Sequence, residues 1–287
     1  MPTLRANGID IYYDLHGRLG AATPLVMTHG FAGPTGSWRD EPLALSEERP
    51  LLLYDVRGHG RTGVPENPEA YSLPTFAADL AALLEALAIE RAHVGGVSMG
   101  GMITAQFAVD YPQMCESVLL IDTTCGNAAG EDAAADWERR LAAGIGALTH
   151  IAQNYGLEET IRREQEWRRA NDPHWNDSPY DPAHDFERIK LMTLPGYVGA
   201  AHAISGRPDL TERVRKIEAP TLLMVGGWDD FLPCAQRDHA LIPGSRLVVR
   251  RECGHGTLWR HETFVSEVRS FRADVEAGRP VVGEREV

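Results

Sequence analysis

Short runs of apolar residues alternate along this chain with longer segments in which apolar residues recur at helical spacing. The short runs are rich in leucine and β-branched residues, and each ends in glycine or a polar turn. This alternation predicts an α/β fold: a mostly parallel sheet with helices on both faces. The predicted strands are 25–28, 51–54, 93–97, 118–121, 221–225 and 247–249, and the predicted helices between them are 75–87, 99–111, 235–241 and 262–277.

The two ends of the chain show different patterns. Asn7 and Gly8 precede an alternating apolar segment at 9–15, which predicts a hairpin turn and an antiparallel start to the sheet. The tail at 278–287 is expected to be a poorly packed terminus.

A long segment interrupts the alternation. Between 124 and 215 no buried-strand pattern occurs, while 136–147 and 158–170 have helical spacing. A structureless insertion of this length would be unusual. We therefore expect residues 124–215 to form a helical subdomain inserted between a first part of the sheet domain, 1–123, and a second part, 216–287.

Composition and charge narrow the class of protein. The chain has 287 residues, of which 43% are hydrophobic and 24% charged, as in an ordinary globular protein. Its 28 Lys plus Arg and 41 Asp plus Glu give a net charge of −13, which would repel nucleic acids and anionic membranes. We expect neither as a partner, and polyanionic substrates are weakly disfavoured.

Cysteine spacing and the apolar stretches bear on the compartment. The four cysteines are too far apart for a zinc site or a dense disulfide framework, so thiols are expected. The first residues lack the apolar core of a signal peptide, and no uncharged apolar stretch approaches the roughly 18 residues of a membrane span. A cytoplasmic protein is the resulting expectation.

The sequence Gly-Val-Ser-Met-Gly at 96–100 carries the clearest chemical signal. It lies where a predicted buried strand ends and a helix begins. A serine on such a sharp turn is held in a strained backbone conformation, and glycines two residues to either side leave room for the turn. Ser98 is therefore the candidate nucleophile.

A serine nucleophile needs a base, and the base needs a carboxylate to orient it. His255 lies in a glycine-containing loop between the last predicted strand and the final helix, and Asp229 follows the preceding strand. We expect His255 to be the base and Asp229 the acid. Asp122, which follows another strand, is the alternative acid.

Acyl transfer also needs two amide donors for the oxyanion. The amide of Met99 is one candidate, because it follows the nucleophile and opens a helix. The loop after strand 25–28 should supply the second, and there Gly30 allows a sharp turn and the Phe31 amide is the candidate.

Taken together, these motifs resemble the α/β-hydrolase fold family. They occur in family order over most of the chain outside the inserted segment, at His29-Gly30, 55–60, the Ser98 turn followed by Gly101, 226–233 and Gly254-His255. The resemblance implies an eight-stranded, mostly parallel sheet, a Ser-Asp-His triad, and a helical cap at 124–215. It also implies that 55–60 is a structural turn, so His59 is expected to have no chemical role.

The residue types at two positions set this chain apart from relatives of other activity. Haloalkane dehalogenases and epoxide hydrolases of this fold carry aspartate where this chain has Ser98, and Gly101 stands where a β-lactamase-like pair would need lysine. The expected function is hydrolysis of a carboxylic ester or lactone. The alternatives are a carbon–carbon bond hydrolase or cofactor-free perhydrolase using the same triad, and a ligand receptor on the same fold.

Aromatic residues suggest where a small-molecule substrate would lie. Trp137 and Trp167 fall in the inserted segment, while Trp38 and Trp228 flank motifs of the sheet domain. An aromatic-walled cleft is one interpretation, and packing of the cap against the sheet domain is the other. No metal site and no cofactor are expected, and the oligomeric state is open.

Overall fold

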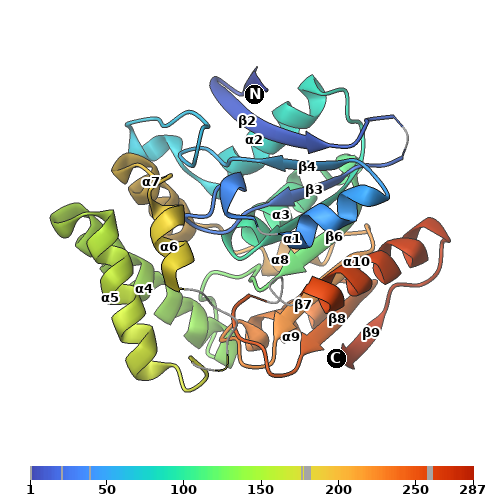
Figure 1. Ribbon diagram of the computed structural model, residues 1–287. Coiled ribbons are helices and arrows are strands. Elements are labelled where there is room, and N and C mark those ends of the chain that lie inside the picture. The colour runs from blue at the N-terminus through green and yellow to red at the C-terminus, as the bar shows by residue number, and fades with distance from the viewer. Residues whose placement is uncertain (1, 21, 39, 176, 178–181, 257–260) are drawn as a thin grey trace.

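The computed structural model describes residues 2–20, 22–38, 40–175, 177, 182–256 and 261–287, and within them the strands form one nine-stranded sheet (Figure 1). The strand order is β1-β2-β4-β3-β5-β6-β7-β8-β9. β2 is antiparallel to β1 and β4, and the other neighbouring strands are parallel. The strands are β1 Thr3–Ala6, β2 Ile9–His16, β3 Leu25–Thr28, β4 Leu51–Tyr54, β5 Ala92–Val97, β6 Cys115–Ile121, β7 Thr221–Gly226, β8 Ser245–Arg250 and β9 Gly283–Glu286.

The predicted strands and the N-terminal hairpin are confirmed. Each predicted apolar run lies within one of β3 to β8. Asn7 and Gly8 form the turn between β1 and β2, with φ of 44° and 77°. Both angles are left-handed, which Asn and Gly tolerate better than other residues, so this dipeptide suits a two-residue hairpin.

Helices cover both faces of the sheet because alternate strand residues point to opposite sides. On β3, Val26 packs in one core cluster with side chains of α2 and α3, whereas Leu25 and Met27 pack in a second cluster with Phe264 and Phe271 of α10. These helices are α1 Asp40–Leu43, α2 Leu73–Ala86, α3 Met99–Asp110, α9 Leu232–Leu241 and α10 His261–Glu276, with short 3-10 turns η1 Thr35–Ser37, η2 Ala44–Glu47, η3 Pro68–Ala70 and η4 Pro112–Met114.

Between β6 and β7 the described chain is helical, as expected from its pattern. The helices are α4 Ala133–Tyr155, α5 Leu157–Asn171, α6 Pro182–Ile189, α7 Leu194–Ser205 and α8 Thr211–Val214, and α4 to α7 lie together beside the sheet (Figure 1). The two helices predicted here fall in α4 and α5. The pattern missed α7 because it is buried on more than one side and shows no apolar stripe.

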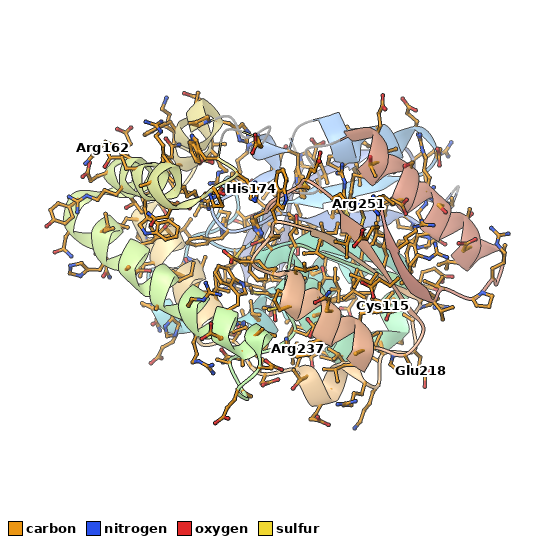
Figure 2. All side chains as sticks on the ribbon, turned by 90° about the horizontal axis from the view of Figure 1, so that it is seen from below. Cys115, Arg162, His174, Glu218, Arg237 and Arg251 are labelled. Atoms are coloured by element: carbon orange, nitrogen blue, oxygen red, sulfur yellow. The ribbon has the colours of Figure 1, made fainter. Side chains whose placement is uncertain are left out.

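A buried ion network joins α4 to the sheet domain. Glu138 of α4 is fully buried and pairs at 2.9 Å with Arg237 of α9, which Figure 2 labels. Arg237 also pairs with Asp238, whose Oδ2 accepts the Cys125 amide at 2.7 Å. A buried charge is stable only when it is paired, so these contacts fix the end of α4 nearest the sheet. None of the described helices combines the length and apolar character needed to cross a membrane.

The C-terminal prediction is wrong. Residues 283–286 form β9, which pairs in parallel with β8, and Val281 is only 4% exposed. The apolar pattern missed this strand because its side chains are exposed and mostly charged, and backbone pairing alone places it at the sheet edge. The sheet therefore has one strand more than the eight that the family resemblance implies.

The cysteine prediction is confirmed. Cys115, Cys125, Cys234 and Cys253 are buried free thiols. Burial raises the pKa of Cys115 and of Cys234 to about 12. Thiols of this kind are poor nucleophiles, so they leave the chemistry to other residues.

Candidate active site

Ser98 occupies the sharp turn between β5 and α3. Its φ of 55° and ψ of −118° lie outside the regions that residues other than glycine normally adopt, so the turn stores backbone strain. Strand β6 and the residues just after it hold this geometry: the Ser98 amide donates to Ile121 O at 2.9 Å, and Thr123 Oγ1 donates to Ser98 O at 2.7 Å. The side chain is only partly buried, as a nucleophile requires.

The glycines around Ser98 are required by contact distances. A Cβ on Gly96 would lie 2.2 Å from Gly100 O, and a Cβ on Gly100 would lie 2.1 Å from Thr28 O. A Cβ on Gly101 would lie 2.5 Å from Cγ2 of Thr123. The first turn of α3 thus packs directly on backbone, which explains the run of glycines.

We expect Gly100→Ala to destabilise the protein strongly, because the added methyl group must push the Thr28 carbonyl aside. The expected loss in the free energy of unfolding is about 3 kcal/mol or more. Denaturant unfolding monitored by circular dichroism measures it.

Gly144→Ala is the matched control, because Gly144 is exposed in α4 and a Cβ there meets nothing within 4 Å. That substitution should instead stabilise the protein by about 0.5–1 kcal/mol, since alanine is the better helix former. Equal stability of the two variants would contradict the packing argument.

His255 and Asp229 lie together, as the sequence predicts. His255 Nδ1 is 2.9 Å from Asp229 Oδ2, and Asp229 Oδ1 accepts the Phe231 amide at 3.0 Å. With Nδ1–H donated to the carboxylate, Nε2 is left as the acceptor for a substrate proton. Burial of His255 lowers its pKa, but the charge and hydrogen bond of Asp229 outweigh burial and leave the pKa raised.

Asp122 is a second carboxylate at the same imidazole. It is fully buried, directly follows β6, and its Oδ2 accepts the Gly256 amide at 3.0 Å. Its charge also raises the pKa of His255. Asp122, Asp229 and His255 each offer one ligand atom, and these atoms lie within 4.8 Å of one another, the one such cluster among the described residues. We interpret the group as proton-handling, since Asp229 and His255 are hydrogen-bonded to each other.

Backbone contacts connect the segments that carry these residues. Ser98 is bonded to Ile121, and the next residue, Asp122, is bonded to the loop of His255. On the other side, the Trp228 amide donates to Cys253 O at 2.9 Å, which ties the Asp229 loop to the His255 loop. The residues that follow β5, β6, β7 and β8 therefore meet at the carboxyl ends of these parallel strands, where α/β proteins bind their ligands.

The loop after β3 passes close to Ser98. A Cβ on Gly30 would lie 3.5 Å from Ser98 Cβ. His29 Nδ1 donates to Gly30 O at 2.8 Å, and the Gly33 amide donates to the same oxygen at 3.1 Å. These bonds fix the peptide that carries the Phe31 N–H. The Met99 N–H is in the first turn of α3, where amides have no acceptor within the helix.

His59 contributes to this loop, a role that its position in a structural turn did not reveal. Its Nε2 accepts the Ala32 amide at 3.3 Å, and its ring lies 4.8 Å from that of His29. Burial lowers the pKa of His29 to about 4 and that of His59 to about 3, so both are neutral. The turn at 55–60 is structural, as expected: Asp55 accepts the Thr35 amide at 2.6 Å.

Phe231 is a neighbour of the imidazole that sequence analysis missed. Its ring stacks on His255 at 5.1 Å between centroids, and its amide donates to Asp229. Trp137 of α4 packs edge-on against Phe231 at 5.4 Å. The only sequence signal for Phe231 is its place two residues after Asp229.

The other tryptophans named from the sequence have different surroundings. Trp228 stacks on His174 at 3.8 Å between ring centroids, and Figure 2 shows His174 between the helices around α5 and the sheet. Trp38 packs against the core cluster that includes α10. Trp167 is 66% exposed, as for a surface side chain.

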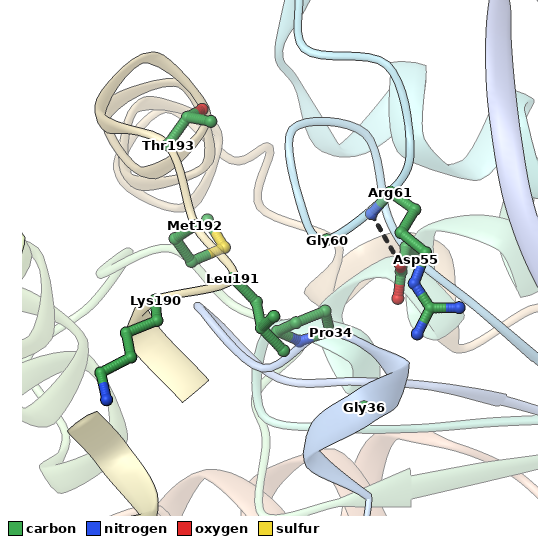
Figure 3. Close-up of a pocket in the computed structure, with 9 residues that line it drawn as sticks. All are labelled: Pro34, Gly36, Asp55, Gly60, Arg61, Lys190, Leu191, Met192 and Thr193. Carbon is green, nitrogen blue, oxygen red and sulfur yellow. Dashed lines mark hydrogen bonds between the residues drawn. The ribbon is translucent and has the colours of Figure 1, made fainter. Parts of the chain in front are cut away.

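A pocket of about 320 Å³ lies between the turn after β4 and the segment that follows α6 (Figure 3). Asp55, Arg61, Lys190, Leu191 and Met192 contribute to its walls, and the Arg61 amide donates to Asp55 Oδ2 at 2.9 Å. None of Ser98, Asp229 and His255 lines it. The pocket is therefore separate from the site predicted from the sequence.

Comparisons with known proteins agree with the fold and the motifs. A family model described as the alpha/beta hydrolase fold matches residues 23–143. A Bacillus subtilis protein described as a 2-succinyl-6-hydroxy-2,4-cyclohexadiene-1-carboxylate synthase is 30% identical over 249 residues, covering 82% of this chain and 84% of that protein. A proline iminopeptidase of Lactobacillus crispatus is 27% identical over 269 residues, 86% of this chain and 89% of its own.

Structure comparison finds the same fold. The enol-lactonase of Burkholderia xenovorans LB400 is similar with a TM-score of 0.77 at 24% sequence identity, over 95% of this chain and 100% of that one. The named activities of these proteins differ, so they show the fold and the family without showing a substrate. The chain belongs to the α/β-hydrolase fold family, as its motifs indicate.

Proposed function

We propose that this protein is a serine hydrolase that cleaves a carboxylic ester or lactone through an acyl-enzyme. The observation that carries the proposal is the placement of Ser98 on a strained turn whose backbone is bonded, through Ile121 and Asp122, to the loop of His255. Ser98 is the proposed nucleophile, His255 the general base and Asp229 the acid that orients it.

In the proposed first half-reaction, Ser98 Oγ attacks the carbonyl carbon while His255 Nε2 takes the hydroxyl proton. The carbonyl electron pair moves to oxygen, where the amides of Phe31 and Met99 donate to the resulting oxyanion. As the intermediate collapses, the bond to the leaving oxygen breaks and His255 returns the proton to it. Asp229 stabilises the imidazolium between these two transfers.

Water completes the reaction in the second half. His255 removes a proton from water, the hydroxide attacks the acyl-enzyme, and Ser98 leaves with the proton from His255, releasing the acid. Serine, histidine, aspartate and water supply every group required, so the proposed reaction needs no metal or organic cofactor.

We propose that the helices within 124–215 form a cap over this site and shape the substrate pocket. Two contacts support this assignment. Trp137 of α4 contacts Phe231 next to the imidazole, and Trp228, which adjoins Asp229, stacks on His174 of the inserted segment. Apolar walls discriminate by only about 1–3 kcal/mol per methylene, so the walls bias the choice of acyl group without fixing it.

A substrate panel beside an active-site probe tests the proposal. The panel contains p-nitrophenyl esters, small and large lactones, a vinylogous diketone and a prolyl amide, and a fluorophosphonate tests whether Ser98 is an activated nucleophile. We expect turnover of at least one ester or lactone and labelling that mass spectrometry locates at Ser98.

Other outcomes identify the competing functions. Cleavage of the diketone without any ester would indicate a carbon–carbon bond hydrolase, and turnover restricted to the amide would indicate a peptidase. Slow labelling with tight ligand binding would indicate a receptor. Each of these results would overturn the ester or lactone assignment.

A further inference from the structure

Arg188, in the last turn of α6, reaches from the proposed cap to the loop that carries Phe31. Its Nη1 donates to Phe31 O at 2.8 Å, and its Nη2 donates to Asp185 Oδ1 at 3.0 Å. The side chain is 22% exposed. A charged group thus makes a direct hydrogen bond to the backbone of a residue proposed to hold the oxyanion. Charge-assisted bonds of this kind are stronger and shorter than neutral ones.

The peptide between Phe31 and Ala32 is held on both of its edges. Arg188 bonds to its carbonyl oxygen, and its N–H, from Ala32, donates to His59 Nε2 at 3.3 Å. Ala32 has φ of 54°, a left-handed conformation that is unfavourable for alanine. A strained residue keeps such a conformation only where its surroundings impose it, and here one of the two bonds comes from α6.

The preceding peptide, which carries the Phe31 N–H, is held by two bonds from the sheet domain. His29 Nδ1 and the Gly33 amide both donate to its carbonyl, Gly30 O. The backbone of Phe31 therefore joins one peptide fixed by the sheet domain to another fixed partly by α6. Release of the second peptide would leave the backbone of Phe31 held from one side only, so the loop could shift and move the Phe31 N–H relative to Ser98.

Apolar side chains of α6, of α7 and of the segment between them also pack on this loop. Tyr197 of α7 packs on the Phe31 ring at 4.6 Å between centroids, and Ala32 shares a buried cluster with Ile189 and Met192. Arg188 adds a charged contact to these apolar ones. Its charge also reaches the buried His29, whose pKa it lowers slightly beyond the larger effect of burial.

We propose that Arg188 is a positioning residue for the oxyanion hole, which steadies the Phe31 amide through the carbonyl of the same residue while α6 is docked on the loop. The inference rests on the proposed function, because it assigns Arg188 a part in the same acyl transfer. It implies that the proposed cap must be docked on the loop for the chemical step as well as for substrate binding.

Three variants test this inference on the full chain. Arg188→Met keeps much of the side-chain length but has no hydrogen-bond donor. Arg188→Lys keeps the charge but has one donor nitrogen, so it cannot reproduce both bonds of the guanidinium group. Arg162→Met is the control: Arg162 also pairs with a carboxylate of its own helix region, Glu159, but lies at the outer edge of α5 (Figure 2). The best ester of the panel gives kcat and KM, and a trifluoromethyl ketone, which forms a tetrahedral oxyanion adduct with serine, gives an inhibition constant.

We expect Arg188→Met to lower kcat by about 10- to 100-fold, somewhat less than complete loss of an oxyanion donor. KM should change little, and affinity for the trifluoromethyl ketone should fall by the same factor as kcat. Arg188→Lys should recover part of both losses, and Arg162→Met should match the wild type. A purely structural role would lower thermal stability without this paired loss.

The outcomes separate this inference from the proposed function. Unchanged kcat or unchanged ketone affinity in an Arg188 variant, with fluorophosphonate labelling intact in the wild type, would overturn the role of Arg188 alone. A loss expressed only in KM would do the same. Absence of labelling and turnover in the wild type would overturn both. If Arg188→Met does not fold, Arg188→Lys decides the question, because its kcat and its affinity for the trifluoromethyl ketone should still fall together.

Discussion

Ser98→Ala is expected to abolish hydrolysis, lowering kcat by on the order of 10⁵–10⁶-fold, because no other group at the site can form the acyl-enzyme. The substitution removes one oxygen and leaves the glycines and backbone bonds of the turn in place, so the fold should survive. Steady-state kinetics with the best ester of the panel measures the loss, and fluorophosphonate labelling should disappear with it.

Ser266→Ala is a suitable control, since Ser266 is exposed on α10 and its hydroxyl donates to Thr263 O of the same helix. Its kcat should equal that of the wild type. Residual turnover by the Ser98→Ala protein near the wild-type rate, at unchanged thermal stability, would show that another residue or a bound water performs the attack.

Asp229→Asn is expected to lower kcat by about 10³–10⁴-fold. The asparagine can offer an amide N–H toward His255 Nδ1 and so favour the imidazole tautomer whose Nε2 carries the proton. That tautomer cannot accept the serine proton. Kinetics of the purified variant measure the effect, and the unfolding midpoint establishes that the buried site is intact.

Asp122→Asn is the matched comparison, because it also removes one carboxylate charge from the surroundings of His255. An asparagine Oδ1 can still accept the Gly256 amide, so the loop should stay in place. We expect a loss of kcat much smaller than for Asp229→Asn. A larger loss at Asp122 than at Asp229 would make Asp122 the acid of the triad.

The pH profile gives this comparison a second readout. The base must be neutral to accept a proton, so kcat/KM is lost below the pKa of His255 in the free enzyme. The described charges that affect this histidine are those of Asp229, Asp122, Asp230 and Arg168. Asp122 raises the pKa of His255, so its removal should lower that pKa and move the acid limb to lower pH. An unmoved limb would show that Asp122 acts only through the loop.

Several parts of the fold and site could be predicted because their signals are local. The turn at Asn7 and Gly8 needs two residues that accept left-handed angles. The turn at Ser98 needs glycines because a Cβ on Gly96 or Gly100 would lie only 2.2 or 2.1 Å from a backbone oxygen. Strands such as β3 and β7 are buried on both faces, so they are apolar throughout.

Other parts left little or no trace in the sequence. β9 is held by backbone pairing at the sheet edge, so its exposed charged side chains hide it. The packing of α7, against α4 and around Phe31, removes the one-sided pattern by which surface helices are recognised. Such elements depend on which segments become neighbours.

For the chemistry, the amino-acid sequence by itself determined the residue types and their order: a serine between glycines at a strand end, then an aspartate and a histidine after later strands. The spacing of strands and turns along the chain sets that order. Only the tertiary structure decided that Asp122 joins Asp229 at His255, that Phe231 stacks on the imidazole, and that Arg188 reaches Phe31 O. The physical reason is distance along the chain: Arg188 and Phe31 are 157 positions apart, and only the packing of α6 on the sheet domain brings them within a hydrogen bond.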